Sequence, residues 1–166
     1  MSLSIIVLAL VTLQRLAELF IATANTRALM SHGAYERGSR HYTALVAMHG
    51  AWLVGLWVFG WSRPVDLGWL AVFLVLQALR LWVLATLGGR WTTRIIISPG
   101  APLVRNGPYR YFSHPNYMVV VAEIAVLPLA FGLVAFATVF TLLNAIVLLV
   151  RLRAESQALR EGVIGA

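Results

Sequence analysis

Long apolar runs separated by short polar segments dominate the chain. Residues 3–24, 44–61 and 67–87 each match the ~20 residues that a helix needs to cross a bilayer core. The run 117–150 is too long for one crossing, because at ~1.5 Å per residue it would extend about 50 Å against a core of about 30 Å. The segment 128–132 (PLAFG) interrupts it near its middle and predicts a helical hairpin. The pattern therefore predicts an all-α integral membrane protein with five transmembrane helices.

Composition agrees with a membrane protein. Apolar residues make up 60% of the chain and charged residues 11%, and the mean hydropathy of +0.83 lies far above that of soluble domains. The net charge of +7 does not point to nucleic acid here, because the arginines cluster between the apolar runs. The chain has no cysteine, which excludes thiol catalysis, disulfides and a cysteine-based metal site. No metal site is predicted.

The arginines predict the orientation in the membrane. With five crossings, the segments 25–40 and 88–116 and the C-terminal tail share one side, which holds ten arginines, whereas the other side holds only Arg63. The ten are Arg27, Arg37, Arg40, Arg90, Arg94, Arg105, Arg110, Arg151, Arg153 and Arg160. By the positive-inside rule, the loop 88–116 and the tail are cytoplasmic and the N-terminus lies outside.

Ionisable residues inside the apolar runs are costly in lipid, so they are expected to face partners or a cavity. Arg15 and Glu18, at positions i and i+3, are predicted to pair on an inward face. Glu123 lies seven residues into the last run and is expected to pair with Arg80 or Arg94, unless it serves as a base.

The segment 103–117, LVRNGPYRYFSHPNY, is the strongest candidate for a ligand site. It concentrates Gly, Pro, Tyr, Arg and His directly before an apolar helix, whose start offers unpaired N–H donors. Further along, Asn144, Arg151 and Glu155 are spaced by seven and four residues, so they project from one face of the last helix as it leaves the membrane. A solvated ion pair between Arg151 and Glu155 is the alternative for that face.

Two motifs carry a family resemblance: GPYRY at 107–111 and SHPNY at 113–117, with Arg153 and Glu155 after the final run. Together they resemble the isoprenylcysteine carboxyl methyltransferase and phospholipid methyltransferase superfamily, and the N-terminal half is similar to its short bacterial members. Two positions depart from the family pattern: Ser113 stands where an Arg is usual, and Ser156 where a second Glu is frequent.

The resemblance implies methyl transfer from S-adenosylmethionine to an oxygen, either of a carboxylate or of a phenol or enol hydroxyl. The acceptor is expected to be a lipophilic, lipid-tailed molecule at the cytoplasmic face of a bacterial inner membrane. Two alternatives stay open: an NADPH-dependent membrane reductase of the sterol-reductase type, and a non-catalytic membrane scaffold. Nothing in the sequence indicates an oligomeric state.

A single domain is expected over residues 1–166, with three spans in 1–87 and the cofactor-binding loop, hairpin and tail in 88–166. By the resemblance, the candidate cofactor-binding residues are Leu103, Gly107, Tyr109, His114, Pro115, Tyr117, Asn144, Arg151 and Glu155. The candidate catalytic residues are His114, Glu123 and Arg94, since a hydroxyl acceptor must lose a proton whereas a carboxylate need not.

Overall fold

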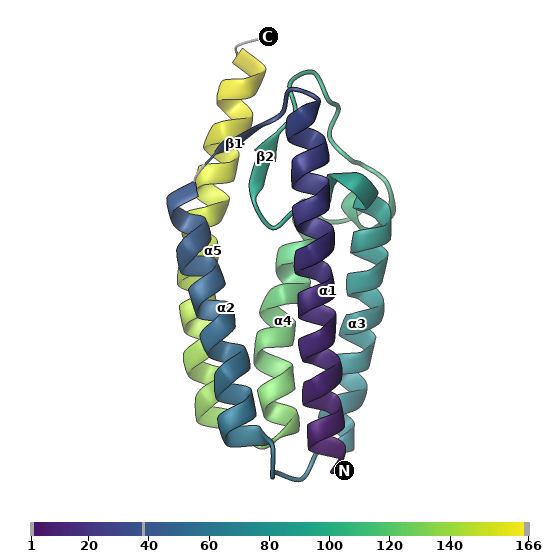
Figure 1. Ribbon diagram of the computed structural model, residues 1–166, viewed down its shortest axis with the longest axis vertical. Coiled ribbons are helices and arrows are strands. Elements are labelled where there is room, and N and C mark those ends of the chain that lie inside the picture. The colour runs from purple at the N-terminus through teal and green to yellow at the C-terminus, as the bar shows by residue number, and fades with distance from the viewer. Residues whose placement is uncertain (1, 38, 165–166) are drawn as a thin grey trace.

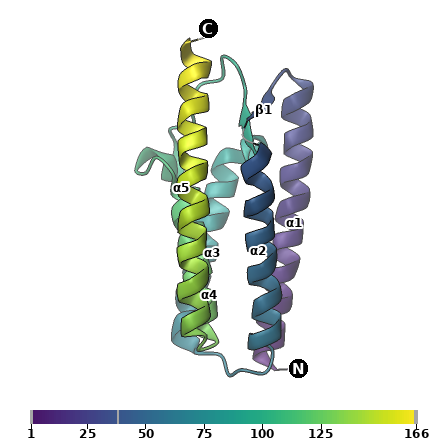
Figure 2. The same cartoon turned by 90° about the vertical axis from the view of Figure 1, so that its left-hand side faces the viewer.

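The computed structural model describes residues 2–37 and 39–164, with the backbone alone for 39–41 and 154–164. Five long helices form an upright bundle (Figures 1 and 2): α1 (Leu3–Ser31), α2 (Ser39–Gly60), α3 (Leu67–Leu87), α4 (Pro115–Ala130) and α5 (Val134–Ile164). Successive helices run in opposite directions, so the two termini lie at opposite ends of the bundle (Figure 1). We call the end near the C-terminus the loop end.

Among the described residues, four helices are long and apolar enough to cross a membrane: α1, α2, α3 and α5. Their outward faces carry large apolar side chains such as Leu13, Phe20, Val54 and Leu142, each more than half exposed. A soluble protein would not expose so much apolar surface, whereas lipid favours it. The prediction of a helical, multi-pass membrane protein is confirmed, while the number of crossings stays a prediction.

Helix α4 has 16 residues and is the shortest of the five. It packs against α3 and α5, and Val119, Ile124, Val126 and Leu127 on it are buried. Because its neighbours cover it, α4 presents little surface to lipid and does not need the full length of a lipid-facing span. After α4, the chain reverses through a turn in which Leu133 N donates to Pro128 O and Gly132 takes a positive φ of 69°.

The apolar core lies in the half of the bundle away from the loop end. Trp52 of α2 is 1% exposed and packs with Leu8, Leu56 and Leu127. Its indole N–H also donates to the carbonyl of Ile124 at 3.2 Å, which ties α2 to the central helix. This core fixes α4, and α4 in turn positions the residues at its start.

A two-stranded antiparallel sheet closes the loop end, which the pattern of apolar runs does not predict. Strand β1 (Tyr35–Arg37) pairs with β2 (Ile95–Ile97) in the register Tyr35↔Ile97. Three consecutive isoleucines favour a strand, because β-branched side chains suit a pleated surface. The predicted all-α class therefore holds for the membrane bundle but not for the connections above it.

Arg94 and Glu36 join the two strands through their side chains. Arg94 Nη1 donates to both carboxylate oxygens of Glu36 at 2.8 Å, and its guanidinium lies 4.3 Å from the centre of the Tyr42 ring. Of the two partners expected for Glu123, Arg94 is therefore engaged elsewhere, and Arg80 is the one that contacts Glu123.

Candidate functional site

A cavity of about 830 Å³ lies at the loop end. Its walls come from the segment 90–113, which includes strand β2, from the first turn of α4, and from Leu29 of α1, Leu87 of α3 and Arg151 of α5. Helix α4 begins lower in the bundle than the upper ends of α1 and α3 (Figure 1), and the connections between helices cover the space that this leaves. The shortness of α4 therefore makes room for the cavity.

Gly107 sets the shape of one wall. It begins the short helix η2 (Gly107–Arg110) with a positive φ of 55°, a conformation that side chains disfavour. A Cβ at this position would also collide with the Thr86 side chain of α3. Glycine is thus needed here twice, for its backbone conformation and for the close approach of η2 to α3.

The cavity brings together most of the loop residues expected from the sequence. Leu103, Tyr109, His114, Tyr117, Arg151 and Arg94 all line it. Gly107 and Pro115 belong to the same segment but are not among the lining residues. The side chains of Arg40, Glu155, Ser156 and Arg160 lie outside the described part of the chain.

Three side chains in the wall connect α4, α5 and the segment that precedes β2. The His114 and Tyr117 rings stack with centroids 5.5 Å apart. Arg151 donates from Nε to the Tyr117 hydroxyl at 3.0 Å and from Nη1 to the carbonyl of Thr93 at 2.7 Å. Arg151 is 9% exposed, so its orientation is fixed by these contacts. This cluster orders the part of the cavity that contains the second sequence motif.

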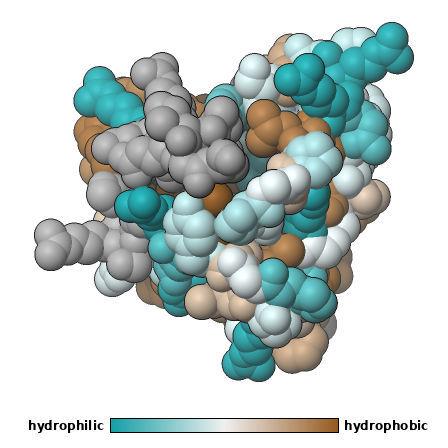
Figure 3. All heavy atoms as spheres, turned by 90° about the horizontal axis from the view of Figure 1, so that it is seen from above, coloured by the Kyte–Doolittle hydropathy of each residue, from teal (hydrophilic) through white to brown (hydrophobic). Residues whose placement is uncertain are grey.

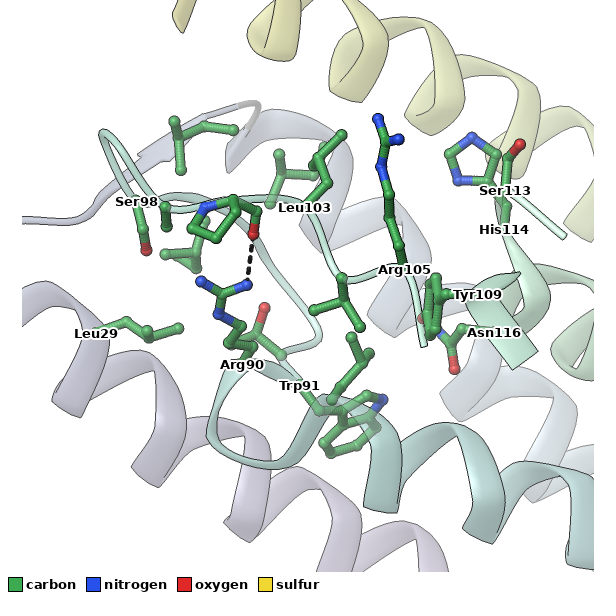
Figure 4. A pocket seen from close by; sticks show the side chains of 18 of the residues that line it. Leu29, Arg90, Trp91, Ser98, Leu103, Arg105, Tyr109, Ser113, His114 and Asn116 are labelled. Atoms are coloured by element: carbon green, nitrogen blue, oxygen red, sulfur yellow. Dashed lines mark hydrogen bonds between the residues drawn. The ribbon is translucent and has the colours of Figure 1, made fainter. Parts of the chain in front are cut away.

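The cavity lining is strongly basic. It includes Arg90, Arg94, Arg105, Arg110 and Arg151, and no acidic residue among the described lining side chains. Arg90 is held by a 2.7 Å hydrogen bond to the carbonyl of Pro102, the bond drawn in Figure 4. Seen from above, hydrophilic and apolar residues are mixed on this face of the molecule (Figure 3). Such a lining favours anionic groups, such as a carboxylate or an oxyanion.

Two further polar atoms in the wall were not singled out by the sequence analysis. Trp91 Nε1 and Asn116 Oδ1 are buried and have no hydrogen-bond partner within the described chain. Asn116 lies within the SHPNY motif, which marked the segment but not this side chain. The sequence did not indicate a ligand site at Trp91, because a tryptophan beside arginines is also typical of an anchor at the membrane interface.

The model of the isoprenylcysteine carboxyl methyltransferase (ICMT) family matches residues 69–161, which include every part of the cavity wall except α1. The chain belongs to the ICMT family. An uncharacterized protein of Bacillus subtilis (strain 168), YpbQ, is 37% identical over 161 residues, 94% of this chain and 96% of the relative. An uncharacterized protein of Haemophilus influenzae is 26% identical over 152 residues, 87% and 88% of the two chains.

No solved structure matches the chain significantly. Membership of the ICMT family makes the chain a membrane methyltransferase and confirms the resemblance drawn from the two motifs. The family match begins at Trp69 in α3, so α1 and α2 lie outside it.

A buried ionic network joins α1, which lies outside the family match, to α3 and α4, which lie within it. Glu123 is fully buried and accepts hydrogen bonds from Arg80 at 2.7 Å, Arg15 at 2.9 Å and Gln77 at 2.8 Å. Glu18 also binds both arginines. Two carboxylates thus face two guanidinium groups, which confirms the predicted pairs Arg15–Glu18 and Arg80–Glu123. Glu123 does not line the cavity.

Asn144 lies on the buried face of α5 and does not line the cavity either. Its side chain is fully buried, and neither amide atom has a partner among the described residues. Its spacing of seven residues from Arg151 corresponds to about 10 Å along the helix. Asn144 and Arg151, expected on one face of the last helix, therefore lie at different depths. Of these two side chains, only Arg151 lines the cavity.

Proposed function

We propose that this ICMT-family chain transfers a methyl group from S-adenosylmethionine to an oxygen of a lipid-tailed acceptor at the cytoplasmic face of the membrane. The observation that carries the proposal is the cavity that the two loop motifs form at the start of α4. Its volume of about 830 Å³ is within the range of ~300–1,000 Å³ typical of small-molecule sites. The proposed orientation places the loop end, with its many arginines, in the cytoplasm.

The residues present fit the cofactor. Apolar residues of β2 and the loop, including Ile95, Ile97 and Leu103, offer a surface for a purine base. Arg105 extends toward the region of His114 in Figure 4, where a carboxylate would be stabilised.

The cofactor, when bound, supplies an electrophilic methyl group on a sulfonium. The task of the protein is then to align an acceptor oxygen and to exclude water. The arginines of the lining favour an anionic oxygen, because they stabilise the deprotonated form of a hydroxyl or a carboxylate. The lining thus favours an oxyanion as the acceptor, so the proposal is oxygen methylation.

We assign the proton-accepting role for a hydroxyl acceptor to His114. It lines the cavity, and its ring is held by the stack on Tyr117. Glu123, by contrast, has both carboxylate oxygens occupied by Arg15, Arg80 and Gln77 away from the cavity. Its contribution is proposed to be structural. Arg94 lines the cavity but is bound to Glu36, so it holds the sheet and adds positive charge.

An NADPH-dependent reductase is the second candidate, because a basic lining also suits phosphate groups. Calorimetric titration of the purified protein with S-adenosylhomocysteine and with NADPH distinguishes the two. We expect S-adenosylhomocysteine to bind and NADPH not to bind. His114→Ala should weaken that binding, whereas Arg63→Gln, at the far end of the bundle, should leave it unchanged. Binding of NADPH alone would support a reductase, and binding of neither would support a scaffold.

The type of acceptor oxygen has its own test. Membrane lipids incubated with the protein and a methyl-labelled cofactor are extracted and treated with dilute alkali. A methyl ester of a carboxylate hydrolyses and releases labelled methanol, whereas a phenol or enol ether resists mild treatment. Label that mass spectrometry locates on nitrogen would contradict the proposal of oxygen methylation.

A further inference from the structure

The short helix η2 (Gly107–Arg110) and the two residues after it contribute to the cavity on one side only. Pro108 is buried and Tyr109 lines the cavity. Tyr111 and Phe112, by contrast, are 69% and 51% exposed and are not among the lining residues. Single exposed apolar residues are common, but two adjacent aromatic rings outside the long apolar helices indicate a surface that covers them.

Helix η2 lies beside the last turn of α3, which is long and apolar enough to cross a membrane. A Cβ at Gly107 would collide with Thr86 in that last turn. Trp82, one turn deeper on the same face of α3, is 47% exposed. The segment before α4 extends sideways from the bundle near the upper end of α3 (Figure 2). The exposed aromatic pair therefore lies where a lipid-facing helix leaves the bilayer.

The composition of this segment matches the surface of a bilayer that carries anionic lipids. Tyrosine and tryptophan are enriched where membrane meets water, because their rings are apolar and their edges are polar. Arg110 is exposed next to the aromatic pair. Between Asp66 and Glu123 the chain has five arginines and no acidic residue, so no carboxylate of this segment repels an anionic headgroup. One arginine near such a surface strengthens binding by about fivefold.

We propose that Arg110, Tyr111 and Phe112 dock on the headgroup region of an anionic bilayer and anchor η2 there. The two rings enter the interface, and the guanidinium of Arg110 binds a lipid phosphate. Because Tyr109 of the same segment lines the cavity, this contact holds the cavity wall at the membrane surface. The anchor does not depend on the proposed reaction, and its test needs no cofactor.

The depth of position 112 tests the anchor. The chain has no cysteine, so Phe112→Cys can be spin-labelled alone, in nanodiscs that contain phosphatidylglycerol. Collisions of the label with oxygen, which concentrates in lipid, are compared with collisions with a water-soluble nickel chelate. Ser31→Cys is the reference in water, because the 29 residues of α1 extend about 44 Å against a core of about 30 Å. We expect oxygen to dominate at 112 and the chelate at 31; equal access of the chelate to both would overturn the anchor.

The role of the charge is tested with the label at Tyr111→Cys, which leaves Phe112 in place. Compared with phosphatidylcholine alone, added phosphatidylglycerol should shift the ratio of docked to water-exposed label by about fivefold. Arg110→Gln should abolish that shift. Arg27→Gln, which removes an exposed arginine of α1 at the same end of the bundle, is the matched control and should keep it. No shift in the parent protein, or a shift that survives Arg110→Gln, would overturn the assignment to an anionic surface.

Two further readings complete the test. Phe112→Ser, measured with the label at 111, should raise access of the nickel chelate while the thermal melt stays near that of the parent, because half of the Phe112 side chain is already exposed. A label at 112 that is shielded from both reagents, with dipolar broadening of its spectrum, would indicate contact with a second copy of the chain and would overturn docking on lipid.

Discussion

The buried ionic network gives the sharpest test of how the bundle is held together. Replacing Glu123 by Gln preserves the shape of the side chain but removes one of two negative charges that balance Arg15 and Arg80. One positive charge of the network is then left uncompensated next to a side chain that is fully buried. The new amide N–H₂ would also face groups that are themselves donors.

The magnitude follows from the contacts. Two unit charges about 4 Å apart interact by about 4 kcal/mol at an effective dielectric constant of about 20. Breaking a buried pair by removing one partner costs about 3–5 kcal/mol in soluble proteins. We therefore expect Glu123→Gln to destabilise the fold by about 3 kcal/mol, which corresponds to roughly 6–12 °C in melting temperature for a chain of this length.

The assay is thermal unfolding in detergent, followed by circular dichroism. The double variant Arg15→Gln/Glu123→Gln restores neutrality and should recover at least about half of the loss. Glu36→Gln is the matched control, because its partner Arg94 is 38% exposed, and it should cost less than about 1 kcal/mol. A Glu123→Gln protein that melts like the wild type, or a double variant that shows the sum of the two single losses, would refute the reasoning.

Three further results are expected. Gly107→Ala forces a side chain into a positive-φ position against the Thr86 side chain and should cost about 1–3 kcal/mol with loss of S-adenosylhomocysteine affinity, whereas Gly89→Ala, with no atom within 4 Å, should melt unchanged. Arg151→Gln loses two charge-assisted hydrogen bonds and should lower stability by about 2 kcal/mol. In intact cells, a cysteine at position 63 should react with an impermeant reagent and one at 106 should not; equal labelling would overturn the orientation.

The sequence predicted the parts of the fold that depend on local pattern. Apolar runs of bilayer length follow from the cost of unpaired backbone groups in lipid, and they correspond to α1, α2, α3 and α5. The pair Arg15–Glu18 also follows from spacing, because residues i and i+3 are neighbours on a helix. The motifs at 107–111 and 113–117 located the wall of the cavity for the same reason, since they are continuous in the chain.

Contacts between distant segments could not be derived in this way. The sheet pairs residues about 60 positions apart, and a strand of three residues has too short a pattern to predict its partner. The preference of Arg94 for Glu36 over Glu123 is decided by that pairing. Asn144 was placed with Arg151 on one helical face, but only the packing of α5 shows that it lies deeper and outside the cavity lining.

By itself, the sequence determined the membrane setting, the helical bundle, the family and the segment that forms the site. These properties rest on hydropathy and on continuous motifs, which are local. The tertiary structure alone decided that Trp91 Nε1 and Asn116 Oδ1 have no hydrogen-bond partner among the described residues and that Glu123 is enclosed by two arginines and a glutamine. Burial and hydrogen bonding depend on which helices meet and at what depth, and no local pattern contains that information.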